Sequence, residues 1–571
     1  MRIRFSQRQI YRLYILVSVV IGVLFIFLFH LRRQPDKAVY HGPVDTAMSP
    51  PRQVGEKGKM VEPPKAPRPA HKFVVDHKKL GKAAMHEYND GYENTGFNKY
   101  ASDRIPLDRD IPDTRSLKCA STPFYDESAI LFYPSLGVAI PLRNEPRSTL
   151  LRTVHSILNR TRPSLLKEIV LLDDFSDSEE TVSALKEAEK MSPKITVLRN
   201  GARLGLHLSR LQAILKVTAD VVFTTDAHVE VGYGWAEPLL FFLQKTRQPQ
   251  AVYSPTLDII DKDTFEYFGT QPVKPTYVIG IDFFLDTLPL WNTPEQQRHF
   301  DRSYAPIQEP AVGTHFAMRT EFYGKIGGIS MNRMAGADVE ISFKAWLCGD
   351  GIFRNPCSRV GHIDRDPVLS QDADSMISPE EVIQEKSSLA KYWMEDYAHF
   401  VCSRFKPHLC RDVPVHSDMT LSDRKSCQAF KSYLTNAAFM IFIPFPNDLQ
   451  AQGQIVNNAQ GGEMCLTQVL WRLTGRPTLQ TCLPSITARN QYFMLTKKGE
   501  LRQDNGCIEY TLDALRKMKC NNARTWNYQD SMLKHLASDL CLTRGDNSVV
   551  TVAACKKGEK KQIWTFRSPT E

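Results

Sequence analysis

The tripeptide Asp226-Ala227-His228 is the part of this sequence with the clearest chemical potential. It follows residues 221–225, an apolar and β-branched run that is typical of a β-strand. Side chains at positions i and i+2 of an extended strand point to the same side, so the Asp226 carboxylate and the His228 imidazole could bind one divalent cation. The alternative is that these side chains only cap the following turn.

A second segment, residues 357–365, offers further groups of the right kind. His362 could supply a third metal ligand, and Arg365 could bind a phosphate. A mixed oxygen and nitrogen site beside phosphates suits Mn²⁺ or Mg²⁺, and the imidazoles favour Mn²⁺. Such a cation would act as a Lewis acid and neutralise a leaving pyrophosphate.

These groups need a scaffold, and the sequence predicts an α/β fold between residues 115 and 430. Apolar runs alternate with helical patterns in the order strand, helix, strand, helix, strand, helix, strand, over residues 136–142, 148–160, 168–174, 181–191, 195–200, 208–217 and 220–228. This alternation predicts a mostly parallel sheet with helices on both faces and ligands at the carboxyl ends of the strands. Asp173, Asp174 and Asp226 all come at such strand ends.

Residues 448–571 predict a different, all-β unit. Three close cysteine pairs recur in it, each within a unit of about 40 residues that also holds an aromatic core element: Cys465/Cys482, Cys507/Cys520 and Cys541/Cys555. The repeats predict a β-trefoil, and the close pairs suit disulfides formed in an oxidising compartment. A zinc site would need clustered CxxC or CxxH knuckles, which the sequence lacks.

The N-terminal segment predicts attachment to a membrane. Residues 13–31 are almost entirely apolar and, as a helix, would span about 28 Å, enough to cross a bilayer. A cleaved signal peptide or a buried core helix are the alternatives, but no small-residue cleavage pattern follows the run. Arginines within residues 1–12 favour a cytoplasmic tail. We therefore expect a single-pass protein with residues 34–571 outside the cytosol.

Between the span and the folded part, residues 32–114 read as a stem rich in Pro, Lys and Gly. The whole net charge of +9 falls within residues 1–100, and the remainder is neutral. The charge therefore concerns topology, and we expect no nucleic-acid partner. Asn159 begins an N-x-T sequon and could carry a glycan if it is exposed, although an accidental sequon is the alternative.

Several longer blocks then carry a family resemblance: SDRIPLDRDIPDTR (102–115), RSTLLRTVHSILNRT (147–161), LLKEIVLLDDFSD (165–177), DAH (226–228), GWAEPLL (234–240), SPTLDIIDKDTFEYF (254–268), VEISFKAWLCGD (339–350), PCSRVGHIDR (356–365) and YWMEDY (392–397). In type and order they resemble the polypeptide N-acetylgalactosaminyltransferases. These are type II Golgi membrane enzymes with a GT-A catalytic domain and a C-terminal ricin-type lectin domain.

The resemblance implies an activity and site roles. The implied reaction is the transfer of GalNAc from UDP-GalNAc to Ser or Thr hydroxyls of proteins, with retention at the anomeric carbon. It implies Mn²⁺ ligands at Asp226, His228 and His362, sugar-nucleotide contacts at Asp174 and Arg203, and a diphosphate contact at Arg365. It also implies disulfides Cys119–Cys357 and Cys348–Cys427, which leaves Cys402 and Cys410 as a possible sixth pair.

The chain departs from the family at four places. The family's Trp-Gly-Gly-Glu-Asn block reads Met334-Ala335-Gly336-Ala337-Asp338, and a Gly-Gly turn reads Gly313-Thr314. The segment after Arg365 looks like a shortened lid. The lectin repeats begin Cys-Leu-Thr, Cys-Ile-Glu and Cys-Leu-Thr where sugar-binding repeats have Cys-Leu-Asp, so Glu509 is the one candidate lectin residue.

Three functions are thus open. The first is an active Golgi glycosyltransferase, the second a catalytically weak or inactive relative that binds nucleotide or glycoprotein, and the third a membrane protein that binds carbohydrate through its trefoil. The retained metal triad favours the first. Met334, Ala337 and the short lid are the arguments for the second, and Thr467 and Thr543 argue against the third.

Overall fold

The structure is a computed structural model. It describes Phe73 and then residues 80–270, 276–280, 286–290, 304–328, 336–363, 365, 378–402, 410, 424, 426–437, 448–459, 462–468, 476–483, 489–503, 506–511, 514–520, 525–546 and 549–567. No helix in these ranges has both the length and the apolar composition needed to span a bilayer. The predicted cytoplasmic tail and the membrane span at residues 13–31 lie outside them, as do Met334 and the predicted lid after Arg365.

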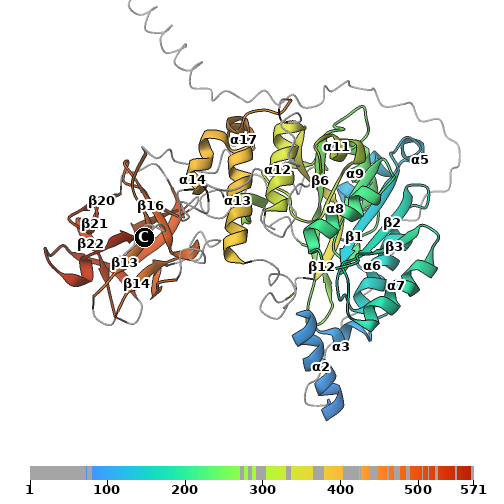
Figure 1. Ribbon diagram of the computed structural model, residues 1–571, viewed down its shortest axis with the longest axis horizontal. Coiled ribbons are helices and arrows are strands. Elements are labelled where there is room, and N and C mark those ends of the chain that lie inside the picture. The colour runs from blue at the N-terminus through green and yellow to red at the C-terminus, as the bar shows by residue number, and fades with distance from the viewer. Residues whose placement is uncertain are drawn as a thin grey trace, which may run out of the picture. The chain divides into compact units, whose positions relative to one another are not determined.

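The α/β region is built on one ten-stranded sheet with the order β10-β12-β6-β11-β4-β1-β2-β3, to which β5 and β7 add at β12 and β6 (Figure 1). Its strands are β1 Leu136–Leu142, β2 Leu166–Asp173, β3 Ile195–Arg199, β4 Val221–Thr224, β5 Val229–Val231, β6 Ala251–Ile260, β7 Tyr267–Phe268, β10 Ile307–Gln308, β11 Phe316–Arg319 and β12 Gly351–Ile363. Strands β8 Thr276–Gly280 and β9 Asp286–Leu290 form a separate hairpin.

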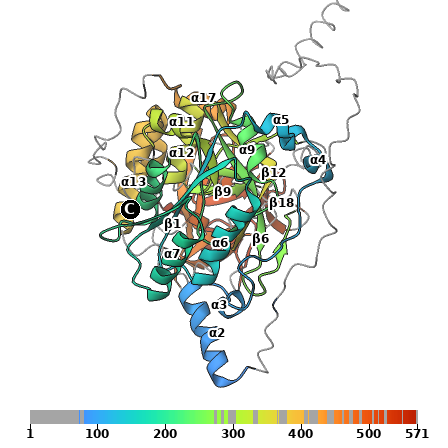
Figure 2. The ribbon, with the colours of Figure 1, turned by 90° about the vertical axis from the view of Figure 1, so that its right-hand side faces the viewer.

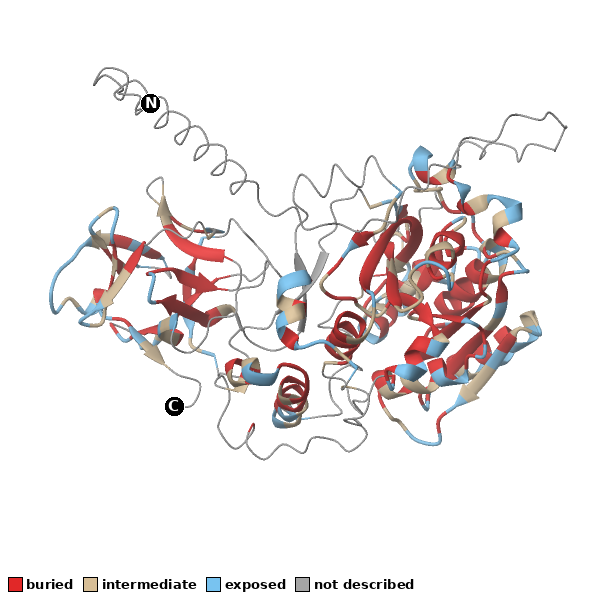
Figure 3. Ribbon diagram, turned by 90° about the horizontal axis from the view of Figure 1, so that it is seen from above, coloured by how far each residue is buried: buried red, intermediate tan, exposed pale blue. Residues whose placement is uncertain are grey.

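Helices cover both faces of the sheet, as predicted. Side chains from α6 Arg147–Arg160, α7 Glu179–Met191 and α9 Ala236–Phe242 share one core with the strands. The opposite face packs against α8 Leu206–Lys216, α11 Thr320–Lys325, α12 Ala337–Cys348 and α13 Pro379–Trp393. The central strands are buried along their length (Figure 3). Local signals begin these helices: Ser178 caps α7, and Ser378 with Glu381 forms a capping box at α13.

The sheet is mixed, whereas a mostly parallel one was predicted. Strands β3, β2, β1 and β4 are parallel neighbours, and β6 and β12 are also parallel. Between these two groups, β11 runs antiparallel to both β4 and β6. The sequence pattern missed β11 because the strand has only four residues and pairs with a strand about 90 residues earlier, which no local periodicity reveals. The antiparallel direction of β11 places the residues just before it next to the end of β4, where the candidate site lies.

Helices and a small buried core lie before residue 115, within the range predicted as the stem. Helix α2 Lys82–Thr95 projects from the α/β region, and α3 Lys99–Ser102 follows it (Figure 2). Phe97, Ala101, Ile105 and Ile111 are buried in a core shared with β6, β7 and β12. Four apolar side chains spread over fifteen residues escaped detection because they follow no helix or strand period.

The C-terminal region is all β, in agreement with the prediction. It contains β13 Leu449–Asn457, β14 Met464–Thr467, β15 Thr478–Thr481, β16 Tyr492–Thr496, β17 Leu501–Gln503, β18 Gly506–Thr511, β19 Ala514–Lys519, β20 Trp526–Gln529, β21 Met532–His535, β22 Leu540–Arg544, β23 Val550–Ala554 and β24 Thr565–Arg567. Phe493, Trp526 and Trp564 lie in one buried core, as the repeats predicted. The indole nitrogens of both tryptophans donate to the carbonyl that follows a repeat cysteine, Ile508 O and Leu542 O.

All twelve cysteines are paired. The pairs are those expected from the sequence: Cys119–Cys357, Cys348–Cys427, Cys402–Cys410, Cys465–Cys482, Cys507–Cys520 and Cys541–Cys555. Asn159 is exposed near the end of α6, where a glycan could attach. The boundaries of the predicted domains at residues 115–430 and 448–571 remain predictions.

Candidate functional site

Two antiparallel pairings bring distant segments to the end of β4. Strand β11 pairs with β4 so that Phe316 faces Thr224, which places residues 313–315 beside residues 225 and 226. Strand β12 pairs with β5 so that His362 faces Val229, next to His228. The edge predicted to hold ligands therefore collects side chains from three parts of the chain.

One carboxylate and two imidazoles converge at this edge. Asp226, His315 and His362 each offer a ligand atom, and these atoms lie within 4.8 Å of one another. The Asp226 Oδ2 atom is 3.6 Å from His315 Nε2 and 3.5 Å from His362 Nε2. Two nitrogen donors and one oxygen donor at this spacing could hold a divalent cation. Asp226 and His362 were predicted ligands, and His315 was not.

The cluster has a definite charge. Burial alone would raise the pKa of Asp226, but the neighbouring His362 and the positive charge of Arg210 hold it well below its ordinary value, so the carboxylate is ionised. Arg210, which lies on α8, donates a hydrogen bond of 2.9 Å to Asp226 Oδ1. Burial lowers the pKa of His315 to about 3, which keeps this imidazole neutral near pH 7. A neutral imidazole and an ionised carboxylate are the forms that bind metals.

The Nδ1 side of His228 faces a neighbouring group, formed by Glu145 and Arg365. Its Nδ1 atom lies 3.3 Å from Glu145 Oε2 and 3.0 Å from Arg365 Nη2. Asp226 is past the end of β4, and Ala227 and His228 form a bend, so the strand alternation on which the prediction relied stops before them. The imidazole ring of His228 still lies 5.0 Å from that of His362, centroid to centroid.

Glu145 links the predicted metal and diphosphate groups. It is buried just beyond the end of β1, it accepts a hydrogen bond from Thr149, and Arg365 donates to it. Burial alone would raise its pKa, but Arg365 and His228 lower the pKa of Glu145 to about 2. Phe97 supports the same arginine, whose guanidinium carbon is 5.4 Å from the ring centroid. The available signal for Glu145 was an acid shortly after a strand, three residues beyond β1, whereas Asp174 directly follows β2.

Asp174 is committed to the loop that carries Arg203. Its carboxylate accepts hydrogen bonds from the amides of Leu204 and Gly205 and from the Asn200 side chain, all at 2.8–2.9 Å. Gly205 has φ 93°, a left-handed conformation that favours glycine. The adjacent Asp173 pairs with Arg199 and Ser176 and is fully buried. Of the two strand-ending acids, Asp174 is therefore the one near a loop that a ligand could reach.

Two of the family departures can be located. The Thr314 hydroxyl donates to Asp226 Oδ2 at 3.4 Å, so the side chain that replaces a glycine contacts the candidate metal site. Ala337 begins α12 and its methyl group is buried in the core, which leaves no carboxylate at that position.

Comparison with known proteins identifies the chain. Residues 137–327 match the glycosyl transferase family 2 model, and residues 451–568 match the ricin-type β-trefoil lectin domain. The chain is 32% identical over 533 residues to polypeptide N-acetylgalactosaminyltransferase 5 of Caenorhabditis elegans, covering 91% of this chain and 80% of that protein. The chain belongs to the polypeptide N-acetylgalactosaminyltransferase family. The resemblance expected from the sequence blocks is thereby confirmed, and with it an enzyme of the glycosyltransferase class.

Other members agree with this assignment. Polypeptide N-acetylgalactosaminyltransferase 10 of Mus musculus is 29% identical over 503 residues, covering 83% of this chain and 80% of that protein. The crystal structure of GalNAc-T7 with UDP, GalNAc and Mn²⁺ aligns with a TM-score of 0.65 and 26% identity, covering 88% of this chain and 95% of that one. The α/β region with its mixed sheet and the all-β lectin region are thus those of a polypeptide N-acetylgalactosaminyltransferase.

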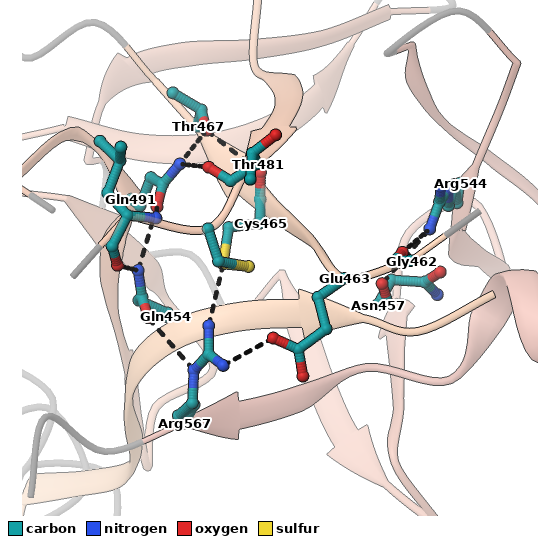
Figure 4. The surroundings of a disulfide bond; sticks show 12 residues. Gln454, Asn457, Gly462, Glu463, Cys465, Thr467, Thr481, Gln491, Arg544 and Arg567 are labelled. Carbon is teal, nitrogen blue, oxygen red and sulfur yellow. Dashed lines mark hydrogen bonds and ion pairs between the residues drawn. A yellow bond between two sulfur atoms is a disulfide. The ribbon is translucent and has the colours of Figure 1, made fainter. Parts of the chain in front are cut away.

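In two lectin repeats of this N-acetylgalactosaminyltransferase, the threonine hydroxyls form hydrogen bonds within the domain. In the first repeat, Gln491 donates to Thr467 Oγ1 and Thr481 O and accepts from Gln454 and Leu483, beside the disulfide of Cys465 (Figure 4). In the third repeat, Gln562 donates in the same way to Thr543 Oγ1 and Ala554 O. Both threonine hydroxyls donate back to the cysteine carbonyl two residues earlier. These hydroxyls stabilise the trefoil and have little capacity left for a sugar.

The middle repeat keeps a carboxylate, but an enclosed one. Glu509 is buried, accepts a hydrogen bond from Thr525 Oγ1 at 3.1 Å and has His535 Nε2 at 3.9 Å. Burial raises the pKa of Glu509 above its ordinary value. A sugar hydroxyl would have to compete with Thr525 for this carboxylate.

We therefore expect the lectin region to bind GalNAc weakly and only through its middle repeat. On a glycan array, Glu509→Ala should remove whatever binding the full-length protein shows. Glu463→Ala serves as the control, since Glu463 is an exposed carboxylate of the first repeat whose ion-pair partner is Arg567. Binding that survives Glu509→Ala would show that another surface holds the sugar.

Proposed function

We propose that this protein transfers GalNAc from UDP-GalNAc to Ser and Thr hydroxyls of proteins, with Mn²⁺ and with retention at the anomeric carbon. The observation that carries the proposal is the convergence, at the end of β4, of Asp226 and His362 with the group formed by His228, Glu145 and Arg365. In this reaction the bond from the anomeric carbon to the β-phosphate oxygen breaks. The acceptor oxygen bonds to that carbon, and the hydroxyl proton leaves with the UDP product.

The donor atoms present fit a divalent cation. Asp226, His228 and His362 would hold Mn²⁺, which neutralises charge on the departing diphosphate. The Glu145 carboxylate faces His228 Nδ1. When a carboxylate accepts the proton of Nδ1, the Nε2 atom of the imidazole is left to bind the metal. The aligned GalNAc-T7 crystal structure, with its UDP, GalNAc and Mn²⁺, supports this chemistry.

Arg365 would bind the diphosphate beside the cation. Its guanidinium is anchored by Glu145 and supported by Phe97, which fixes the direction of its remaining donors. Asp174 and Arg203 would contact the rest of the sugar nucleotide. The Asp174 carboxylate already accepts three hydrogen bonds, and a carboxylate offers about four acceptor sites, so one is left for a ligand hydroxyl.

The location that fits this activity is the Golgi membrane. We propose a single-pass type II orientation, with residues 13–31 as the anchor and the folded part in the lumen. Six disulfides agree with an oxidising compartment. The acceptor partners would be luminal proteins with exposed Ser or Thr.

Release of UDP tests the proposal directly. With UDP-GalNAc, Mn²⁺ and a mucin-like Ser/Thr peptide, the wild-type protein should release UDP and form a glycopeptide of the corresponding mass. His228→Ala should lower this turnover by about a hundredfold, because it removes one predicted ligand and the partner of Glu145.

Other results would point elsewhere. UDP binding that needs Mn²⁺ but gives no glycopeptide would support the second hypothesis, a nucleotide-binding relative without efficient transfer. Among the residues that the structure describes, Ala337 at the start of α12 is the argument for this hypothesis. His155→Ala is the control, because His155 lies partly exposed on α6. Turnover equal in His228→Ala and wild type would reject the role of His228.

A further inference from the structure

We propose that His315 is an additional protein ligand of the divalent cation, so that this chain binds the metal with one more imidazole than the D-x-H motif and His362 provide. The inference deepens the proposed function and rests on the same cation site. It concerns a residue for which neither the motif nor the family resemblance gave a role.

The backbone holds His315 in position. It directly precedes β11, and the pairing of Phe316 with Thr224 fixes residue 315 beside residue 225 across the sheet. The His315 Nδ1 atom lies 2.9 Å from Thr225 Oγ1. With Nδ1 protonated and donating to this hydroxyl, the lone pair of the neutral ring is on Nε2. That atom faces Asp226.

The distances from Asp226 Oδ2 to the two imidazole nitrogens are closer to those between ligands of one cation than to those of hydrogen bonds. Distances of 3.6 Å to His315 Nε2 and 3.5 Å to His362 Nε2 exceed those of ordinary N–H···O hydrogen bonds. Ligand atoms that each lie about 2.1 Å from one metal, at angles of roughly 90–110°, are separated by about 3.0–3.5 Å. A small closure of the cluster therefore gives a coordination geometry.

The rest of the surroundings is consistent with a prepared site. The rings of His315 and His362 lie edge to face with centroids 5.0 Å apart, and His315 is buried. Arg210 and Thr314 bind Asp226 and fix the orientation of its carboxylate. An extra imidazole fills a position that would otherwise take water. It should therefore strengthen metal binding in the absence of nucleotide and favour metals that prefer nitrogen, such as Co²⁺, over Mg²⁺.

Metal binding without nucleotide tests this. Full-length protein in detergent is titrated with Mn²⁺ while the electron paramagnetic resonance signal of free Mn²⁺ is followed. Pulsed measurements on the bound ion then report the directly coordinated histidine nitrogens. In His315→Ala and His315→Gln, the affinity should fall at least about tenfold, and the coupling of one histidine nitrogen should disappear. His155→Ala should change neither.

The glutamine variant keeps a side chain of similar size that can bond to Thr225, so it answers the question if the alanine variant fails to fold. Unchanged Mn²⁺ affinity and unchanged nitrogen coupling in His315→Gln would overturn the inference. Manganese binding that requires His315, in a protein that releases no UDP, would uphold the inference and reject the proposed transfer. UDP release by His315→Gln with the wild-type dependence on Mn²⁺ would overturn the inference and uphold the proposed transfer.

Discussion

Asp226→Asn should reduce glycopeptide formation by at least about a thousandfold, a loss of roughly 4 kcal/mol of transition-state stabilisation. Asp226 is the only carboxylate in the three-residue cluster described at the end of β4. Without it, the cluster offers neutral donors only, and Arg210 adds an uncompensated positive charge beside them. Both effects weaken the binding of a cation and of the charge that forms on the leaving diphosphate.

The asparagine amide keeps the shape of the carboxylate and an oxygen acceptor for Arg210, so the fold should survive. Thermal unfolding close to that of the wild type would confirm this. Asp546→Asn is the matched control, since that carboxylate lies exposed in the lectin region with Lys561 as its ion-pair partner. Retention of more than about a tenth of the wild-type turnover by Asp226→Asn would contradict the metal site argued above.

Glu230→Gln should have the largest effect on stability, lowering the free energy of unfolding by about 3–5 kcal/mol. Arg109 and Glu230 form an ion pair at 2.6 Å, with side chains only 1% and 3% exposed. Arg109 also donates to Phe265 O. The glutamine leaves this guanidinium buried without its counter-charge, which costs more than a lost hydrogen bond. Chemical denaturation of the two proteins at pH 7 measures the difference.

Three further comparisons separate this charge effect from general damage. Burial alone would raise the pKa of Glu230, but Arg109 lowers it below the ordinary 4.5. The ionised form therefore stabilises the fold above that pH, and the difference between wild type and variant should shrink as the pH falls below it. Replacing both partners by methionine should recover much of the stability. Asp546→Asn, which breaks a pair with side chains 37% and 87% exposed, should cost less than about 1 kcal/mol. A loss of that small size in Glu230→Gln would contradict the argument.

The elements with a clear period were predictable from the sequence. The predicted helix at residues 181–191 corresponds to α7 Glu179–Met191, and the predicted strand at 136–142 matches β1. Each has enough residues for its apolar spacing to show, and the strand-to-helix alternation limits their arrangement. The strand-end position of Asp226 followed from the same pattern.

The composition of the site was less predictable, because it depends on pairings between distant segments. His315 reaches Thr225 across 90 residues, through a four-residue antiparallel strand without a visible period. His228 turns towards Glu145, since the chain bends immediately after β4. A motif of alternating ligands assumes an extended backbone, and here the backbone is extended only as far as Thr224.

The packing of Phe97 against Arg365 limits how far the N-terminus can be trimmed by proteases. A cut before Lys82 would keep α2 and the buried side chains of residues 97–111. A cut between residues 103 and 115 would remove the aromatic support of Arg365 and expose the core surface that Phe97 covers. An active trimmed form of this enzyme should therefore begin before Phe97, and a form that begins between residues 103 and 115 should be inactive.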